Sequence, residues 1–275
     1  MTTKEKLDML WKYLALAVVA AGLILFSNMH LEDDDEHIFI GAHDGDHTSA
    51  SFGKTMDVRV EKEVTDGDTI LNVTVNGIPL NDSESQGVWW VNMPDFASSI
   101  GSIQIQRGVG TSTNGASAFG ASVNLKTTGL NKKAYARTNN TFGSYNTLKN
   151  NVEFGTGLLK NKFAFDGRLS QVSSDGYMDR ATSNLKSFYL SAGYFGETEM
   201  LKAIIFSGHE CTYQAWYGVP LNYLDSNRTY NPYTYENEVD NYGQTHYQLH
   251  YSKQMSETTN YNIAAHYTHG EGYYE

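Results

Sequence analysis

The sequence is poor in cysteine, in proline and in positive charge, and each shortage disfavours a class of protein. Its single cysteine, Cys211, excludes an internal disulfide and a zinc site built from cysteines. The 20 Lys and Arg residues against 31 Asp and Glu give a formal net charge of −11, which argues against a nucleic-acid partner, because binding phosphates requires clustered cations. Only 4 prolines beside 25 glycines and 19 tyrosines favour many strands joined by glycine-containing turns over helices.

The N-terminus carries one apolar run, which indicates an export signal. Lys4, Lys6 and Lys12 precede residues 13–26, YLALAVVAAGLILF, an order typical of a signal peptide. The run is shorter than the roughly 20 residues of a spanning helix, and no small-x-small cleavage site follows it. Residues 1–28 are therefore predicted to be either a cleaved signal or an uncleaved hydrophobic helix that anchors the chain. Lysines before the run and acidic residues 32–36 after it place the bulk of the chain outside the cytoplasm.

Residues 29–56 are acidic, contain Gly and Ser, and are predicted to be a solvated linker. Within this linker His43 and His47 stand four apart, a spacing that suits a metal site on a helix. Gly45 between two aspartates favours a turn instead. We therefore expect no metal site and no cofactor.

From residue 57 onward the pattern is one of strands and turns. Alternation over residues 57–64 and 69–75, with turn residues at 65–68, predicts a hairpin. Asn76-Gly77 predicts a second turn, and residues 95–99, just after Pro94, predict a short helical turn.

Long strands with a period of two begin near residue 133. Apolar and polar side chains take opposite faces in residues 162–170, 187–194, 246–252 and 261–268. Tight turns at 159–162, 196–199 and 255–258 alternate with long loops at 174–184 and 217–243. This combination is the signature of a transmembrane antiparallel β-barrel; a soluble sandwich shares the alternation but does not usually keep its short turns on one edge. Two segments fit poorly: residues 201–207, LKAIIFS, are apolar on both faces, and residues 133–141 are polar on both.

Several segments together resemble the TonB-dependent receptors of the Gram-negative outer membrane. They are NVTVNGIPLNDSESQGVWWVNMPDFASSIGSIQIQRGVGTSTNGASAFGASVNLKT, TFGSYNTLKNNVEFGTGLLKNKFAFDGRLSQVSSDGY, HECTYQAWYGVP and HYQLHYSKQM. The resemblance implies an all-β fold: a partial transmembrane antiparallel β-barrel with part of a plug domain, preceded by the hydrophobic helix. Residues 57–130 would hold the hairpin and the later half of the plug. Residues 131–275 would supply about seven of the family's roughly twenty-two barrel strands.

The resemblance also implies a function and partners. The function would be uptake of a ligand such as an iron chelate, vitamin B12 or a glycan, in outer-membrane lipid, with a TonB-type energy-coupling protein. The first half of a plug is missing and residues 1–68 look like a different protein, so we expect a fragment or a join, truncated at Glu275, that does not transport by itself. The alternative is a membrane-anchored binding or structural β protein, held in the inner membrane and facing the periplasm.

The glycine-rich segment within residues 102–127 admits three interpretations: a phosphate cradle, a flexible linker, or closely packed backbone. It lacks the GK[ST] and GxGxxG spacings of phosphate cradles, and alternating strands flank it on both sides. Closely packed backbone is therefore favoured. At a seam between plug and barrel, the predicted residues are Arg107, Gly108, Gly115, Phe119 and Gly120, with Arg107 paired to Glu153 or Asp166.

No catalytic constellation emerges, so the chain is predicted not to be an enzyme. In His209-Glu210-Cys211 the alternation of a strand places Glu210 on the face opposite its two neighbours. Asp166 and Arg168 are predicted to be charges of the barrel interior, and His246, His250 and His266 polar lining of the same interior.

The segment from Tyr213 to Tyr242 collects aromatic and amide side chains. Such a mixture suits a small ligand bound by stacking and hydrogen bonds, or equally an interfacial girdle and self-packing of the loop. The candidate ligand contacts are Tyr213, Trp216, Tyr217, Tyr223, Tyr233 and Tyr235.

Overall fold

The computed structural model describes residues 71–82, 87–107 and 121–275. The signal or anchor helix, the acidic linker, the strand at 57–64 and the seam residues Gly108, Gly115, Phe119 and Gly120 lie outside the described residues. Arg107 is described only by its backbone, in strand β3. None of the helices within the described ranges combines the length and the apolarity that crossing a membrane would require.

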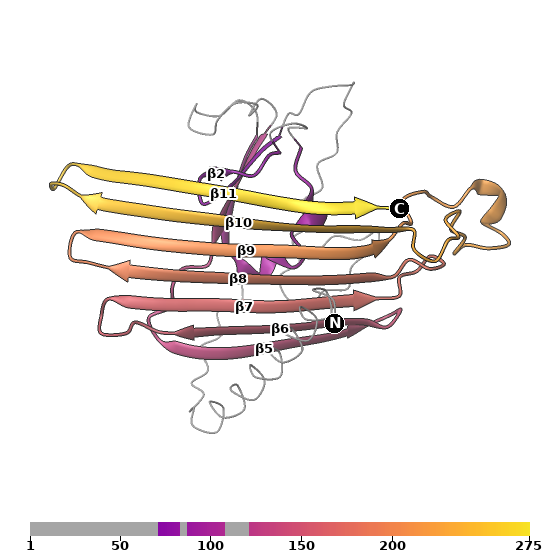
Figure 1. The fold of residues 1–275 in the computed structure, drawn as a ribbon, viewed down its shortest axis with the longest axis horizontal. Coiled ribbons are helices and arrows are strands. Elements are labelled where there is room, and N and C mark those ends of the chain that lie inside the picture. Colours follow the sequence, from indigo (N-terminus) through magenta and orange to yellow (C-terminus); the bar gives the residue numbers. More distant parts are fainter. Residues whose placement is uncertain (1–70, 83–86, 108–120) are drawn as a thin grey trace. The chain divides into compact units, whose positions relative to one another are not determined.

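Seven antiparallel strands form the large sheet, in which each strand pairs with its neighbours in the sequence (Figure 1). They are β5 (Ala134–Gly143), β6 (Thr147–Thr156), β7 (Phe163–Ser174), β8 (Ser183–Phe195), β9 (Glu199–Tyr213), β10 (Val239–Gln254) and β11 (Asn260–Tyr274). The predicted succession of long antiparallel strands is confirmed. The strands extend beyond the predicted segments because the backbone pairing continues past the last alternating side chains.

Connections differ between the two ends of the large sheet, as predicted. Short turns join β6 to β7, β8 to β9 and β10 to β11 at one end, which we call the short-turn end. Residues 175–182 and 214–238, the latter with the 3-10 turn η4 (Leu221–Tyr223), form longer loops at the opposite, long-loop end. A tight turn at 144–146 also lies at the long-loop end.

A small four-stranded sheet has the order β2-β1-β4-β3. Its strands are β1 (Leu71–Val75), β2 (Ile78–Pro79), β3 (Ile100–Arg107) and β4 (Ala121–Thr127), and the 3-10 turns η1 (Trp90–Asn92) and η2 (Phe96–Ser99) lead into β3. The predicted Asn76-Gly77 turn is confirmed, and both residues have the positive φ that such a turn requires. The described neighbours of β1 are β2 and, in parallel, β4; η2 confirms the helical turn predicted after Pro94.

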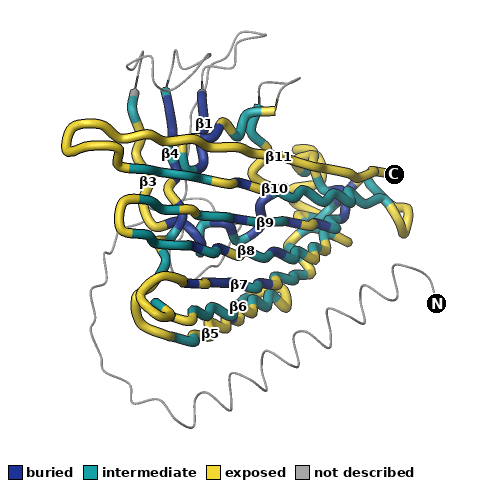
Figure 2. Tube along the Cα trace, turned by 60° about the vertical axis from the view of Figure 1, so that its left-hand side comes forward, coloured by how far each residue is buried: buried dark blue, intermediate teal, exposed yellow. Residues whose placement is uncertain are grey.

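The large sheet separates its side chains into two faces. The inner face contacts the small sheet and buries polar residues such as Asp166, Arg168, Ser187 and Gln248. The outer face exposes apolar and aromatic residues, among them Phe163, Phe165, Leu190, Tyr247, Leu249 and Ile263. The predicted distribution of polar and apolar residues between the faces is confirmed. Figure 2 shows buried segments along the middle strands and an exposed β11.

The hydrophobic core explains why residues 201–207 are apolar on both faces. The core joins Val73, Val75, Met93, Phe96, Ile100, Val123 and Leu125 of the small sheet and its turns to Tyr189, Ile204 and Phe206 of the large sheet. Ile204 and Phe206 therefore point inward to this core, while Leu201, on the other face of β9, is 39% exposed. The inward apolar residues of this segment therefore belong to the core, and the outward ones belong to the exposed apolar face.

Candidate functional site

A single carboxylate, that of Asp95, lies where the small sheet meets the large sheet. Asp95 precedes η2 and has a left-handed backbone, with φ 53° and ψ 24°. Aspartate tolerates this conformation better than most residues do. Ser98 Oγ, three residues on, donates a 2.6 Å hydrogen bond to Asp95 Oδ1, so the turn itself holds the carboxylate in place.

Four side chains from two strands of the large sheet donate to the same carboxylate. From β6, Lys149 Nζ donates to Oδ1 at 2.6 Å and Asn151 Nδ2 to Oδ2 at 3.0 Å. From β7, Arg168 Nη1 and Ser170 Oγ donate to Oδ2 at 3.1 and 2.5 Å. We call Asp95, Ser98 and these four donors the Asp95 junction. Charge-assisted hydrogen bonds of this kind are the stronger class, so the junction ties two sequence-distant elements together.

Arg168 extends the junction to a third strand. Its Nε donates to Ser99 Oγ at 2.7 Å and its Nη1 also donates to Ser187 Oγ of β8 at 3.2 Å. The side chains of Arg168 and Asp95 are only 3% and 7% exposed. A buried guanidinium is tolerated when it is paired with a carboxylate and its donors are satisfied. Asp95 provides the carboxylate, and Ser99 accepts the hydrogen bond from Nε.

The junction also sets the ionisation of Asp95. Burial by itself would raise the pKa of this carboxyl, but the charge of Arg168 and the hydrogen bonds from Lys149, Ser170 and Ser98 outweigh burial and lower the pKa below its usual 3.8. Asp95 is therefore a carboxylate at neutral pH and has no proton to give to a reaction. Its role is to bind the turn before β3 to strands β6 and β7.

An apolar contact accompanies the ionic one. The ring of Phe96, the residue after Asp95, lies 4.7 Å from the ring of Phe206 on β9, and Phe206 stacks on His246 of β10 at 4.4 Å. Farther along β10, Gln248 Nε2 donates to Val75 O at 3.3 Å and Asn76 Nδ2 donates to Gln248 Oε1 at 3.0 Å. The small sheet is thus held across β6 to β10 by charged, apolar and amide contacts.

Gly208 on β9 lies close against the turn between η1 and η2. A Cβ built on Gly208 would lie 2.3 Å from Asn92 O and 2.5 Å from Pro94 Cδ, and the first of these atoms is backbone that cannot rotate away. The inner face therefore requires glycine at this position to admit the turn between η1 and η2.

Gly208→Ala is expected to destabilise the docking of the small sheet by about 1–3 kcal/mol through this overlap. Gly243→Ala, on the neighbouring strand, is the matched control because its Cβ would meet nothing closer than 3.4 Å. Urea unfolding of the detergent-refolded chain, followed by tryptophan fluorescence, measures both variants. Equal midpoints for the two variants would contradict a steric requirement at Gly208.

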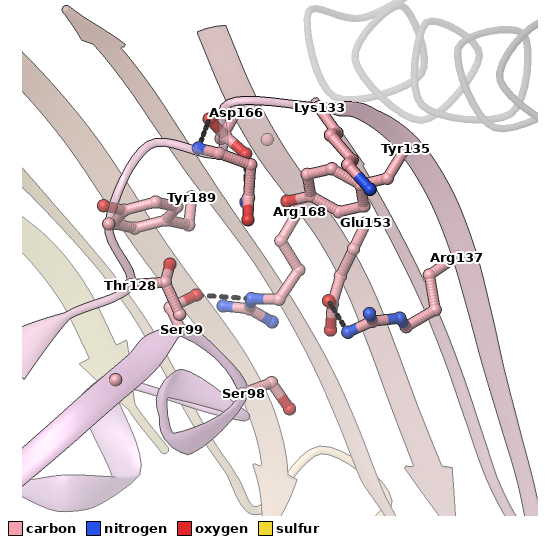
Figure 3. A pocket seen from close by; sticks show the side chains of 14 residues that line it. Ser98, Ser99, Thr128, Lys133, Tyr135, Arg137, Glu153, Asp166, Arg168 and Tyr189 are labelled. Atoms are coloured by element: carbon pink, nitrogen blue, oxygen red, sulfur yellow. Dashed lines mark hydrogen bonds and ion pairs between the residues drawn. The ribbon is translucent and has the colours of Figure 1, made fainter. Parts of the chain in front are cut away.

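A polar cavity of about 390 Å³ lies beside the junction, between the small sheet and strands β5 to β8. Figure 3 shows Arg137 facing Glu153 and Arg168 reaching Ser99 on the cavity wall. Arg137 Nη1 lies 3.7 Å from Glu153 Oε2. Asn131, in the segment that joins the two sheets, donates from its backbone N at 3.2 Å and from Nδ2 at 2.8 Å to Asp166.

The two carboxylates predicted to pair with Arg107, those of Glu153 and Asp166, both contact other residues. Glu153 faces Arg137, and Asp166 accepts from Asn131, so both carboxylates have partners within the described residues. A pairing of either with Arg107 stays a prediction, since the side chain of Arg107 lies outside the described part. The described seam is built from Asp95, Phe96 and Gly208, which sequence reasoning did not assign to it.

Reactive side chains do not converge in the described residues. Among them no three His, Cys, Asp or Glu side chains are grouped as a metal site would require. Glu210 is buried on the inner face, where Thr212 Oγ1 donates to it at 3.2 Å, whereas His209 is exposed. The predicted separation of Glu210 from His209 is confirmed.

The two loops of the long-loop end are joined by backbone-directed hydrogen bonds. Arg180 donates to Tyr233 O from Nε at 3.0 Å and to Asn231 O from Nη2 at 2.9 Å. Asn231, 1% exposed, donates in turn to Asp179 O and Gln214 O. These hydrogen bonds hold the backbone of residues 231–233 against the 175–182 loop.

The predicted ligand contacts fall into different surroundings within this loop. Tyr213 is buried and its hydroxyl donates to Tyr235 O at 2.5 Å. Tyr217 stacks on Tyr233 at 5.8 Å and Trp216 meets the same ring edge-on at 6.2 Å. Trp216, Tyr217, Tyr223 and Tyr235 are exposed. Trp89 and Trp90 of the small-sheet side are exposed as well, and the sequence analysis did not select them.

No family model matches the chain, and no curated protein matches its sequence. Solved structures match its fold. The open form of the ferric-catecholate import receptor Fiu from E. coli K12 superposes with a TM-score of 0.60 at 13% identity, covering 74% of this chain and 32% of that one. The unliganded ferric citrate transporter FecA gives 0.58 at 18% identity, over 75% and 32%. The alcaligin outer-membrane receptor FauA from Bordetella pertussis gives 0.55 at 13%, over 73% and 31%.

These similarities confirm the fold that the resemblance implied. The chain has the fold of part of a TonB-dependent outer-membrane receptor, a plug-like sheet against consecutive wall strands. It spans about a third of the length of the receptors it matches.

Proposed function

We propose that the chain is a plug-and-wall portion of an outer-membrane receptor that takes up a small ligand with the help of a TonB-type energy-coupling protein. One observation carries the proposal: a seven-stranded meander with an apolar outer face holds a second sheet against an inner face that buries polar and charged residues beside a small apolar core. A soluble sandwich would bury apolar residues between its sheets and leave polar residues outside. This chain exposes Phe165, Leu190, Leu249 and Ile263 to the outside.

The dimensions of the large sheet suit an outer membrane. Its strands run from 10 to 16 residues, and a tilted strand needs about 9–11 residues to cross the hydrocarbon layer. A sheet in lipid also needs its edges paired. Within the described residues β5 and β11 each have one neighbouring strand, so we propose that a transporting unit contains further strands and that this chain alone does not transport.

The ligand we propose is an iron chelate, with vitamin B12 and a glycan as the other candidates. The support is the fold, which is similar to those of the ferric-catecholate import receptor and the ferric citrate transporter, together with the exposed aromatics at the long-loop end. Trp216, Tyr217 and Tyr235 are exposed there on a loop held by Arg180, where they would stack on or hydrogen-bond a ligand.

Charge placed on the outer face tests the membrane proposal. Leu190, in the middle of β8, is 41% exposed on that face, so Leu190→Arg is expected to cost about 2–4 kcal/mol in lipid and to reduce recovery with outer membranes. Gln171→Arg, near the long-loop end of β7, is the control and should cost about 0–1 kcal/mol. Fractionation and heat-dependent gel mobility measure both variants. A soluble monomer in which Leu190→Arg is harmless would contradict the proposal.

A further inference from the structure

The short-turn end of β5 to β7 gathers exposed lysines from two segments that are distant in sequence. Lys132 belongs to the segment joining the two sheets, and Lys160 and Lys162 belong to the β6–β7 turn; all three are exposed. Backbone contacts bring the segments together, since Leu158 N donates to Lys132 O at 3.0 Å. The neighbouring Lys133 differs, because it lines the cavity of the inner face (Figure 3). We call Lys132, Lys160 and Lys162 the basic rim.

The positive charge of the basic rim is not balanced locally. Residues 128–133 and 157–162 contain four lysines and no carboxylate. No carboxylate among the described residues lies within ion-pair distance of Lys132, Lys160 or Lys162. The nearby acids of the inner face, Glu153 and Asp166, contact Arg137 and Asn131 instead. In a chain with a net charge of −11, such a rim attracts an anion from outside.

Apolar side chains adjoin the basic rim. Leu159 lies in the same turn and is 45% exposed, and Phe163, the first residue of β7, is 42% exposed. The ring of Phe163 packs on Tyr194 of β8 at 5.3 Å, and Phe165 continues the exposed apolar band along β7. Lysines thus begin where the apolar band ends, which is the level at which aromatic rings and long cationic side chains meet lipid headgroups.

The long-loop end of the large sheet is acidic, whereas at the short-turn end the net positive charge is confined to the β5–β7 side, since the other two turns contain Glu197 and Glu257. The loops 175–182 and 214–238 contain five carboxylates, Asp175, Asp179, Asp225, Glu236 and Glu238, against two arginines. Arg180 is engaged with backbone carbonyls. An anionic headgroup is therefore favoured at the basic rim and disfavoured at the long-loop end.

We propose that the basic rim binds the phosphate of anionic phospholipids in the leaflet at the short-turn end. The inference rests on the proposed function, because it requires the outer face to lie in lipid. The adjoining Leu159 and Phe163 select a lipid over free phosphate, since they would contact acyl chains while the lysines contact the headgroup. Each lysine near an anionic surface strengthens binding by about fivefold.

Vesicle binding by the full chain tests the proposal. We expect at least about tenfold stronger binding to vesicles that are about one third phosphatidylglycerol than to phosphatidylcholine vesicles at low ionic strength. Replacing the rim lysines together, Lys132→Gln, Lys160→Gln and Lys162→Gln, should reduce this preference to about twofold. The matched control removes three cations outside the segments that form the short-turn end of the large sheet, Lys126→Gln, Lys186→Gln and Arg228→Gln, and should keep most of the preference.

Each other result would overturn the inference in a recognisable way. An equal loss in the rim and control variants would show that only overall charge matters. Displacement by inorganic phosphate beyond that caused by chloride at equal ionic strength would indicate a free-anion site. Wash-resistant insertion into both vesicle types without a preference would refute the basic rim and leave the proposed function intact. No association with either vesicle would refute both.

Discussion

Asp95→Asn is expected to lower the free energy of unfolding by about 3–5 kcal/mol, because it leaves two cations buried without their counter-charge. The side chains of Lys149 and Arg168 are 12% and 3% exposed and both contact Asp95. An asparagine side chain offers only one acceptor oxygen. Its NH2 group would face the donors of β6 and β7, which need an acceptor. The small sheet should therefore separate from the large sheet before the strands of the large sheet come apart.

Two spectroscopic signals distinguish separation of the two sheets from unfolding of the whole chain. Trp89 and Trp90 lie at η1, and replacing Trp11 and Trp216 by phenylalanine confines tryptophan fluorescence to that side of the small sheet. Circular dichroism follows the strands, most of which belong to the large sheet. In urea, Asp95→Asn should shift the fluorescence transition more than the dichroism transition. Asp225→Asn, an exposed loop carboxylate, is the control and should stay within about 0.5 kcal/mol of the parent.

The dependence on pH gives the Asp95 junction an independent signature. Because the folded pKa of Asp95 is lowered, the stability it contributes is fully present above the usual value of 3.8 and is lost as the pH falls through the folded value. The parent chain and Asp95→Asn should therefore differ fully at neutral pH and converge in strong acid. A difference that persists unchanged below the folded pKa would show that the carboxylate charge is not what holds the sheets.

The alternation of side chains was sufficient to predict the large sheet but not its contact with the small sheet. The inward positions of Asp166 and Arg168 follow from the period of two, since it depends only on neighbouring residues. The partner of Arg168 is 73 residues away in sequence, and no local pattern connects the two. Asp95 itself reads as an ordinary residue at the start of a helical turn.

One of the two segments that fitted the barrel pattern poorly is explained by the second sheet. Residues 201–207 are apolar on both faces because Ile204 and Phe206 pack against the small sheet. On β6, the strand beside β5, the polar Asn151 is buried where it donates to Asp95. Such departures from alternation indicate where another element docks, but they do not identify that element.

Phe206→Ala is expected to cost about 3–5 kcal/mol, because it opens a cavity in the only hydrophobic core formed between the two described sheets. Phe206 is 2% exposed and lies between Phe96 of η2 and His246 of β10. Phe206→Leu keeps most of the volume and should cost less than about 1.5 kcal/mol. Each variant is made in the chain that keeps only Trp89 and Trp90, and the urea midpoint of its tryptophan fluorescence is measured.

Phe165→Ala supplies the matched control for Phe206→Ala, since Phe165 is 47% exposed on the outer face. It removes the same ring without touching the small sheet, so the fluorescence transition should move little. Equal shifts for the two alanine variants would contradict a docking role for Phe206. Phe206 contacts Phe96, the residue after Asp95. The apolar contact of Phe206 and the ionic contacts of the Asp95 junction are therefore expected to be energetically coupled. Combining Phe206→Ala with Asp95→Asn should therefore cost less than the sum of the single variants, since a sheet that has already separated loses nothing more.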